Sequence, residues 1–169
     1  MALLDFDPVY GVLACTRCRY AVPQAFIVAH LREYHRQDMA PADRQAYAES
    51  FDALPIRPPK EVAQIQPPLY TPPIPYLTLY KDGLCCKLCD NKRLYIVRSK
   101  GTMLHYLKRA HGWRRRVSKQ LPSDPKLEDV TWYPIACQTF HRAAFFRFFA
   151  VYTGDMPLNG AASLPPSSY

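Results

Sequence analysis

Two sets of cysteine and histidine residues have the types and the spacing of metal ligands. The first set is Cys15, Cys18, His30 and His35, which reads C-x2-C-x11-H-x4-H. Thiolate sulfur and imidazole nitrogen are the donors that zinc prefers, and this order is typical of a structural zinc ion. Because the two histidines span about one and a half helical turns, the end of their helix must loosen for both to reach one ion.

The second set is Cys86, Cys89, His105 and His111, which reads C-x2-C-x15-H-x5-H. Cys85 is an alternative first ligand. Cys86 gives the usual two-residue spacing to Cys89, whereas Cys85 would give three, and we favour Cys86. The two sets use four of the five histidines in the chain. We therefore expect two bound zinc ions.

The predicted zinc ions are structural. Each has four protein ligands, which leaves no open position for a water that the metal would activate. The binding energy of zinc would stabilise units of about thirty residues, which are too small to build a sufficient hydrophobic core. Cys137 and His141 are four positions apart and are conceivable as a nucleophile and a base, but no orienting group or oxyanion motif accompanies them. We expect a protein that is not an enzyme.

Short elements must position the first set. Residues 10–35 predict a strand, a knuckle, a second strand and a helix that begins near Pro23, since proline is favoured at a first helical position. We assign residues 8–37 to a first ββα finger and residues 38–54 to a short amphipathic helix.

The second set follows a linker. Residues 55–75 hold eight prolines, which predicts an extended, semi-rigid spacer. Residues 76–116 then predict a second finger, in which Ser99 caps the helix and Gly112 ends it.

The rest of the chain predicts a C-terminal aromatic, β-rich segment. Residues 117–152 begin as a loop, we favour a strand for 131–138, and we expect the segment to pack on the second finger. The Gly, Ala, Ser and Pro content of residues 153–169 predicts a disordered tail. The expected fold is small α+β: two ββα zinc fingers joined by a helix and a proline-rich linker.

Charge is concentrated on the second finger. The formal net charge is +8, and residues 81–119 hold twelve basic and two acidic side chains. Such density indicates a polyanion partner, and aromatic rings among the charges can stack on exposed bases. The interface of 87–119 with DNA or RNA is expected to include Lys100, Lys108, Arg109, Trp113, Arg114, Arg115 and Arg116.

Three stretches of sequence resemble a known family. They read ACTRCRYAVPQAFIVAHLREYH, DGLCCKLC with HYLKRAHGW, and WYPIACQTFHRAAFFRFFAV. Over residues 8–152 the chain is similar to the fungal zinc-finger family named after orsellinic acid biosynthesis cluster protein D. The resemblance implies the finger-bearing region of proteins that are often much longer. Two features depart from the pattern: His141 follows CQTF, and Cys85 doubles the knuckle cysteine.

The combined expectation is a non-catalytic regulatory module that binds zinc and associates with nucleic acid with weak sequence selectivity. The alternative is a scaffold that binds a protein partner through the proline-rich linker and the aromatic segment. Apolar runs are too short to cross a bilayer, and the N-terminus lacks a signal-peptide pattern, so we expect an intracellular protein without a membrane partner. We expect no small-molecule substrate. KRAHGWRRR suggests import into the nucleus.

Overall fold

The chain forms two compact units in a computed structural model that describes residues 2–68, 71–89, 94–113, 131–142 and 146–154. The first unit combines Met1–Pro67 with Ile74–Thr78 and Gln138–Arg147. The second combines Pro68–Pro73, Leu79–Cys137 and Phe148–Tyr169. Each unit therefore contains segments that are distant in sequence.

A three-stranded antiparallel sheet forms the base of the first unit. Its strands, in the order β1-β2-β3, are Leu4–Asp7, Val12–Cys15 and Tyr20–Ala21. β1 pairs along all of β2, and Cys15 lies opposite Tyr20 across the β2–β3 pair. The predicted strand–knuckle–strand is present, and β1 is an addition that the ligand spacing did not indicate.

The helices of the first unit are short, and most of them begin at or just after a proline. These are the 3-10 helix η1 (Gln24–Phe26), α1 (Ile27–Tyr34), α2 (Pro41–Glu49) and α3 (Pro59–Val62). Pro23 precedes η1, as predicted, and Pro41 is the first residue of α2. Proline suits these positions because a helix leaves its first backbone N–H groups without helical partners.

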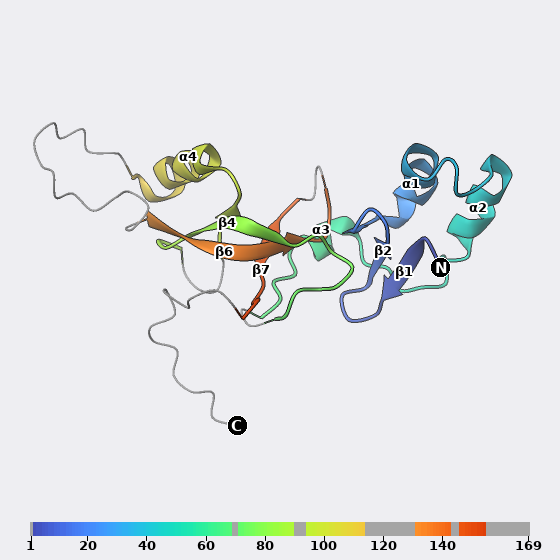
Figure 1. Ribbon diagram of the computed structural model, residues 1–169, viewed down its shortest axis with the longest axis horizontal. Coiled ribbons are helices and arrows are strands. Elements are labelled where there is room, and N and C mark those ends of the chain that lie inside the picture. Colours follow the sequence, from blue (N-terminus) through green and yellow to red (C-terminus); the bar gives the residue numbers. More distant parts are fainter. Residues whose placement is uncertain (1, 69–70, 90–93, 114–130, 143–145, 155–169) are drawn as a thin grey trace, which may run out of the picture. The chain divides into compact units, whose positions relative to one another are not determined.

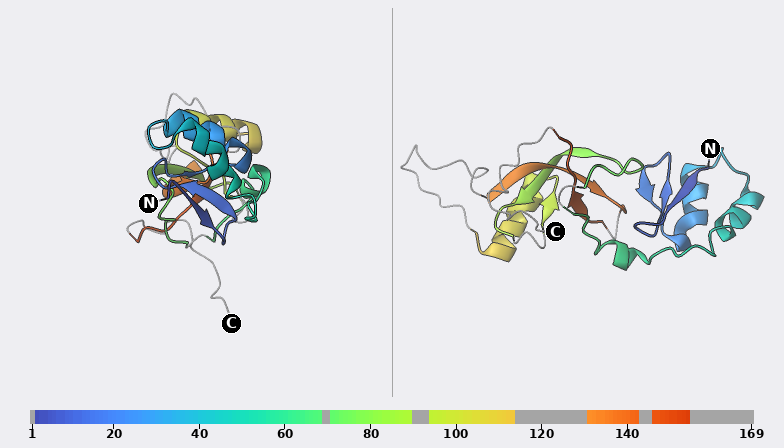
Figure 2. Two further views of the ribbon diagram at one scale, coloured as in Figure 1. Left: turned by 90° about the vertical axis from the view of Figure 1, so that its right-hand side faces the viewer. Right: turned by 90° about the horizontal axis from the view of Figure 1, so that it is seen from below.

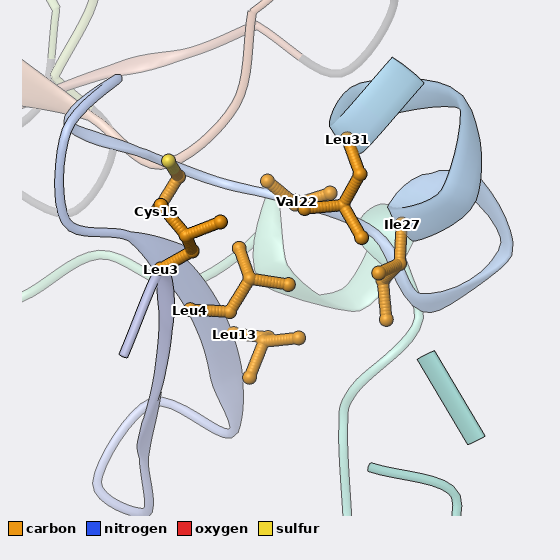
Figure 3. Close-up of a cluster of buried hydrophobic side chains, with 7 residues drawn as sticks. All are labelled: Leu3, Leu4, Leu13, Cys15, Val22, Ile27 and Leu31. Carbon is orange, nitrogen blue, oxygen red and sulfur yellow. The ribbon is translucent and has the colours of Figure 1, made fainter. Parts of the chain in front are cut away.

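One apolar cluster joins the sheet to α1. Ile27 and Leu31, one helical turn apart, lie toward Leu4, Leu13 and the neighbouring apolar side chains (Figure 3). Tyr47 and Phe51, on and just after α2, pack against the same cluster. The apolar side chains of α1 and α2 are thus packed within this unit.

The segment 55–75 differs from the predicted extended spacer. It contains α3, and Val62 is buried, as is Ile74 near its end. Gln138 holds Ile74 through bonds to both its backbone N–H and its carbonyl. Pro58 and Pro59 lie at the start of α3, because proline is compatible with the first turn of a helix. The burial of Val62 and the bonds to Ile74 show that these parts of the segment belong to the folded structure.

A four-stranded sheet forms the second unit, in the order β5-β4-β6-β7. The strands are β4 (Tyr80–Cys86), β5 (Ile96–Val97), β6 (Trp132–Thr139) and β7 (Phe148–Ala150). β4 and β6, the two longest, run antiparallel side by side (Figures 1 and 2). Gly83 permits this pairing, because a Cβ there would lie 2.5 Å from the carbonyl oxygen of Ile135.

The helix of the second unit begins and ends as predicted. α4 spans Lys100–His111, with the hydroxyl of Ser99 accepting a bond from the backbone N–H of Thr102. Gly112 adopts a left-handed conformation at φ 62°, which favours glycine and ends the helix. Met103 and Leu107 are buried against Cys86 and Trp132.

The aromatic segment divides between the two units. A strand was expected for 131–138, and β6 confirms it; β7 also lies in the second sheet. The described residues 138–142 and 146–147, however, group with the first unit, which differs from the prediction that the whole segment packs on the second finger. Residues 117–130 and most of the predicted tail lie outside the described part of the chain.

The fold is a small mixed assembly of helices and two antiparallel sheets. In both units the sheet is larger than a two-stranded ββα hairpin, and in the second unit the distant strands β6 and β7 complete it. Within the described residues, no helix combines the length and the apolar character needed to span a membrane.

Candidate metal centres

The first predicted ligand set comes together in the structure. One donor atom from each of Cys15, Cys18, His30 and His35 lies within 4.8 Å of every other. Sγ of Cys15 and Sγ of Cys18 lie 3.2 and 3.4 Å from Nε2 of His35. A tetrahedral zinc ion with ordinary Zn–S and Zn–N lengths separates such atoms by about 3.5 Å, so the group has the size of a zinc site.

A tight turn between β2 and β3 presents the two cysteines. Arg19 takes a left-handed conformation at φ 59°, and its backbone N–H bonds to the carbonyl of Cys15 at 2.9 Å. The backbone N–H of Cys18 lies 3.3 Å from Sγ of Cys15. An N–H directed at a sulfur stabilises the thiolate form that a metal requires.

The end of α1 brings both histidines to the same point. His30 lies within the helix, while His35 follows its last residue and leaves the helical conformation, with φ −128° and ψ 33°. The helix end therefore loosens, as the five-residue spacing predicted.

Each imidazole is held through Nδ1. The hydroxyl of Tyr20 lies 3.0 Å from Nδ1 of His30, and a carboxylate oxygen of Asp38 lies 3.0 Å from Nδ1 of His35. Arg17 forms an ion pair with the same Asp38. With a proton on Nδ1, Nε2 keeps its lone pair for a metal, and such partners orient metal-binding histidines.

A polar atom within this group is otherwise unexplained. Nε2 of His30 is buried and has no hydrogen-bond partner among the described residues. Burying such a nitrogen without a partner is costly. A metal ion ligated by Nε2 of His30 removes that cost, so the donor set fits zinc.

Burial sets the protonation of the first group. It lowers the pKa of His30 to about 4, with His35 adding to the effect, which keeps the ring neutral at neutral pH. Burial and a hydrogen bond with Cys15 raise the pKa of the Cys18 thiol to about 11 in the absence of metal. Zinc deprotonates a coordinating thiol, so binding would release protons.

The C-terminal segment completes the surroundings of the first group. The backbone N–H of Ala21 donates to the carbonyl of Phe140 at 2.7 Å, and the carbonyl of Ala21 lies 3.0 Å from Nδ1 of His141. The guanidinium of Arg142 lies over the ring of Tyr20, 4.4 Å from its centroid. Residues 140–142 thus support β3 and the tyrosine that orients His30.

The second group contains three of its four predicted ligands. Cys86, Cys89 and His111 offer donor atoms within 4.8 Å of one another. Nε2 of His111 lies 3.6 Å from Sγ of Cys86 and 3.4 Å from Sγ of Cys89. Cys86 comes from the end of β4 and His111 from the last residue of α4. The preferred Cys86 is in the group, and Cys85 is not.

His105 does not join the second group. Its side chain is exposed on α4. It lies six positions before His111, which turns it about 240° around the helix. Unlike His35, which lies beyond the end of its helix, His111 is still helical. The helix therefore does not loosen in a way that would turn both histidine side chains toward one ion. The H-x5-H spacing, one residue longer than in the first group, is the feature of the sequence that could have indicated this outcome.

Tyr106 contacts two members of the incomplete group, Cys89 and His111. Its hydroxyl oxygen lies 3.0 Å from Sγ of Cys89. Its ring stacks on Tyr95 with centroids 3.4 Å apart and meets His111 edge-on at 5.5 Å. Burial and the Cys89 thiol raise the pKa of Tyr106 in the metal-free chain. The spacing of cysteines and histidines did not predict it as part of the metal group.

Cys85 lies in a separate apolar cluster with Cys137 and Phe148. Successive side chains of a strand point to opposite faces of the sheet, so Cys85 and Cys86 cannot both face the metal. Burial raises the pKa of the Cys85 thiol to about 11.

Comparison with known proteins assigns the chain, with both of its metal groups, to a family. The family model for Orsellinic acid/F9775 biosynthesis cluster protein D matches residues 2–112, which contain every cysteine and histidine of both groups. The chain belongs to this family.

A curated relative supports the family and limits what it implies. The Orsellinic acid/F9775 biosynthesis cluster protein D of Emericella nidulans is 30% identical over 150 residues, which cover 88% of this chain. The match covers 26% of the relative, so the chain spans about a quarter of its length. No solved structure matches the chain.

The predicted nucleic-acid residues of this family member are only partly described. Lys100, Lys108 and Arg109 are exposed on α4. Trp113 differs from the expectation of a free stacking ring: it is half-buried and packs against the cluster around Leu107. Arg114, Arg115 and Arg116 lie outside the described residues.

The conceivable nucleophile of the chain is Cys137. It is buried in β6, and its sulfur lies 2.8 Å from the position that a Cβ on Gly83 would take. Burial raises the pKa of its thiol to about 12. A protonated, inaccessible thiol is a poor nucleophile.

Proposed function

We propose that this member of the family is a non-catalytic module in which one structural zinc ion stabilises each of the two units. The second unit binds nucleic acid with weak sequence selectivity. The observation that carries the proposal is the exposed face of α4. Lys100, His105, Lys108 and Arg109 are exposed there, and α4 contains no acidic residue.

Helix geometry gathers these side chains. His105 lies three residues before Lys108 and four before Arg109, the spacings at which side chains are neighbours on a helix. The opposite face carries Met103 and Leu107, which are buried. The basic side chains are therefore directed away from the core, where phosphate groups can approach.

Arg98, which precedes α4, contributes less. Arg98 is engaged with Asp82 through two bonds, at 2.6 and 2.7 Å, and its guanidinium lies 4.0 Å from the centre of the Tyr80 ring. The basic run 114–116 begins three residues after the last residue of α4 and adds positive charge to this part of the sequence. Contacts of this kind bind phosphates without specifying bases, which supports weak selectivity.

A nuclear location accords with the role, with KRAHGWRRR as the import signal.

Titration of the zinc-loaded full chain with short DNA and RNA over a range of salt tests the proposal. Each lost phosphate contact lowers the slope of log affinity against log salt by about 0.7 to 0.9. The double variant Lys108→Gln and Arg109→Gln should therefore lower the slope by about 1.4 to 1.8. The matched control is Arg32→Gln with Lys60→Gln, which removes two exposed charges from the first unit. Equal slopes for both variants would refute the α4 interface.

A groove in the first unit favours binding of a protein partner as a second candidate function. Its volume is about 780 Å³, and its lining includes Phe26, Val28, Ile56, Pro58 and Pro59. Phe26 is 56% exposed, a large fraction for an apolar ring. The aromatic segment is a weaker candidate than expected, because Phe140, Phe148 and Phe149 are buried.

Salt separates the two functions. Binding through α4 weakens steeply as salt rises, whereas an apolar contact in the groove persists. A partner whose binding survives high salt and is lost in Phe26→Ser would favour the groove. Val9→Ser is the control, since Val9 is 71% exposed and does not line the groove.

A further inference from the structure

The two metal groups differ at one position of the same local pattern. In the first group, His30 lies five residues before His35, and both rings reach the cysteines. In the second group, the residue five before His111 is Tyr106, and His105 is one residue earlier. One residue turns a side chain by about 100° around a helix. Tyr106, rather than His105, therefore occupies the position equivalent to His30.

The contacts of Tyr106 agree with this equivalence. Its hydroxyl oxygen lies 3.0 Å from Sγ of Cys89, which is within about 0.5 Å of the edge of a zinc tetrahedron with sulfur and oxygen ligands. The ring is held by its stack on Tyr95, at an interplanar angle of 8°. The oxygen is thus positioned by a packed ring and not by a freely rotating side chain.

Tyr20 shows what a tyrosine does when it is not a ligand. Its hydroxyl contacts Nδ1 of His30, which leaves the buried Nε2, the nitrogen without a hydrogen-bond partner among the described residues, for the metal. In the second group no imidazole stands between Tyr106 and the sulfur of Cys89. The described residues add no other cysteine, histidine or carboxylate to this group.

We propose that the hydroxyl oxygen of Tyr106 is the fourth ligand of the second metal ion. This centre then has two cysteines, one histidine and one tyrosine as ligands, in place of two cysteines and two histidines. The proposal rests on the zinc binding proposed above but not on nucleic-acid binding. Binding of one Zn²⁺ would release the two thiol protons of Cys86 and Cys89 and the phenol proton of Tyr106. His105 remains on the exposed face of α4.

The test is the ultraviolet difference spectrum of the full chain during titration of the metal-free protein with zinc. Ionised tyrosine absorbs differently from neutral tyrosine, so the wild type should show one ionised tyrosine per chain at two equivalents of zinc. The signal should vanish in Tyr106→Phe, with zinc affinity of the second site lowered by more than about tenfold, since loss of an outer partner alone costs about 10- to 100-fold.

Three variants serve as controls. Tyr106→His should bind two equivalents without the signal, because it recreates the His-x4-His spacing of the first group. This variant keeps the test valid if Tyr106→Phe fails to fold. His105→Ala and Tyr20→Phe should retain the signal.

Four results would overturn the assignment. Two equivalents of zinc without an ionised tyrosine would mean that Tyr106 only donates a hydrogen bond to Cys89. Loss of one equivalent in His105→Ala would identify His105 as the ligand. A signal that persists in Tyr106→Phe would belong to another tyrosine. A wild type that binds one equivalent would remove the second centre and the zinc half of the proposed function with it.

Discussion

The hydroxyl of Tyr20 lies 3.0 Å from Nδ1 of His30, while Nε2 of the same ring is buried without a partner among the described residues. The tyrosine thus engages Nδ1 and leaves Nε2 of His30 as the nitrogen that can bind a metal. This relationship makes Tyr20 a positioning residue of the first group, and it can be tested without disturbing any ligand.

Tyr20→Phe should weaken zinc binding at the first site by about 10- to 100-fold, because the imidazole of His30 loses the contact that orients it. Competition with a chromophoric chelator measures the change. Tyr34→Phe is the matched control, since the Tyr34 ring also packs beside His30 and is half-exposed. An equal loss in both variants would show that ring packing, and not the hydroxyl, sets the affinity.

The metal-free chain should become less stable as pH falls from about 6.5 toward 4. The folded state keeps His30 neutral because burial lowers its pKa from 6.5 to about 4, whereas the unfolded chain binds the proton near pH 6.5. Protonation therefore favours the unfolded state within this window and adds no further slope below it. Urea unfolding at several pH values measures the effect.

His141 contributes to the same pH dependence in the same direction. Burial lowers its pKa, and its contact with the carbonyl of Ala21 opposes the shift only in part. Comparing wild type with His141→Gln separates the two histidines. A urea midpoint that does not change between pH 6.5 and 4 would contradict the neutral, buried state of His30.

Gln138→Ala should destabilise the first unit by about 2 to 4 kcal/mol, because each buried polar group left unsatisfied costs about 1 to 3 kcal/mol. The side chain of Gln138 bonds to the backbone N–H and carbonyl of Ile74 and to the carbonyl of Leu77. Chemical denaturation followed by circular dichroism measures the loss. Gln45→Ala, which removes an exposed bond to Glu49, should change stability by less than about 0.5 kcal/mol.

Alanine at two glycines of the second unit should have opposite effects. At Gly83 a Cβ would lie 2.5 Å from the carbonyl oxygen of Ile135, and separating β4 from β6 should cost about 1 to 3 kcal/mol. At Gly101 the nearest atom is Oγ of Ser99 at 3.6 Å, and alanine should stabilise α4 by about 0.5 to 1 kcal/mol. Thermal unfolding of both variants gives the comparison. A stable Gly83→Ala variant would show that the two strands can separate at low cost.

The amino-acid sequence by itself determined the local features of both centres. The C-x2-C knuckle, the helix ends at Ser99 and Gly112, and the loosened end of α1 follow from spacing and residue type, and the structure agrees with each. These features depend on neighbours within a few residues, so local chemistry is sufficient to predict them.

Only the tertiary structure decided which side chains complete the sites. A shift of one residue along α4 turns a side chain by about 100°, which excluded His105 and brought Tyr106 to Cys89. The bonds from Ala21 to residues 140–141 join segments about 120 positions apart, and no local spacing encodes such a pairing. Long-range packing places these residues, and the physical reason is that helix rotation and strand pairing set the direction of a side chain, which the order of residue types alone does not specify.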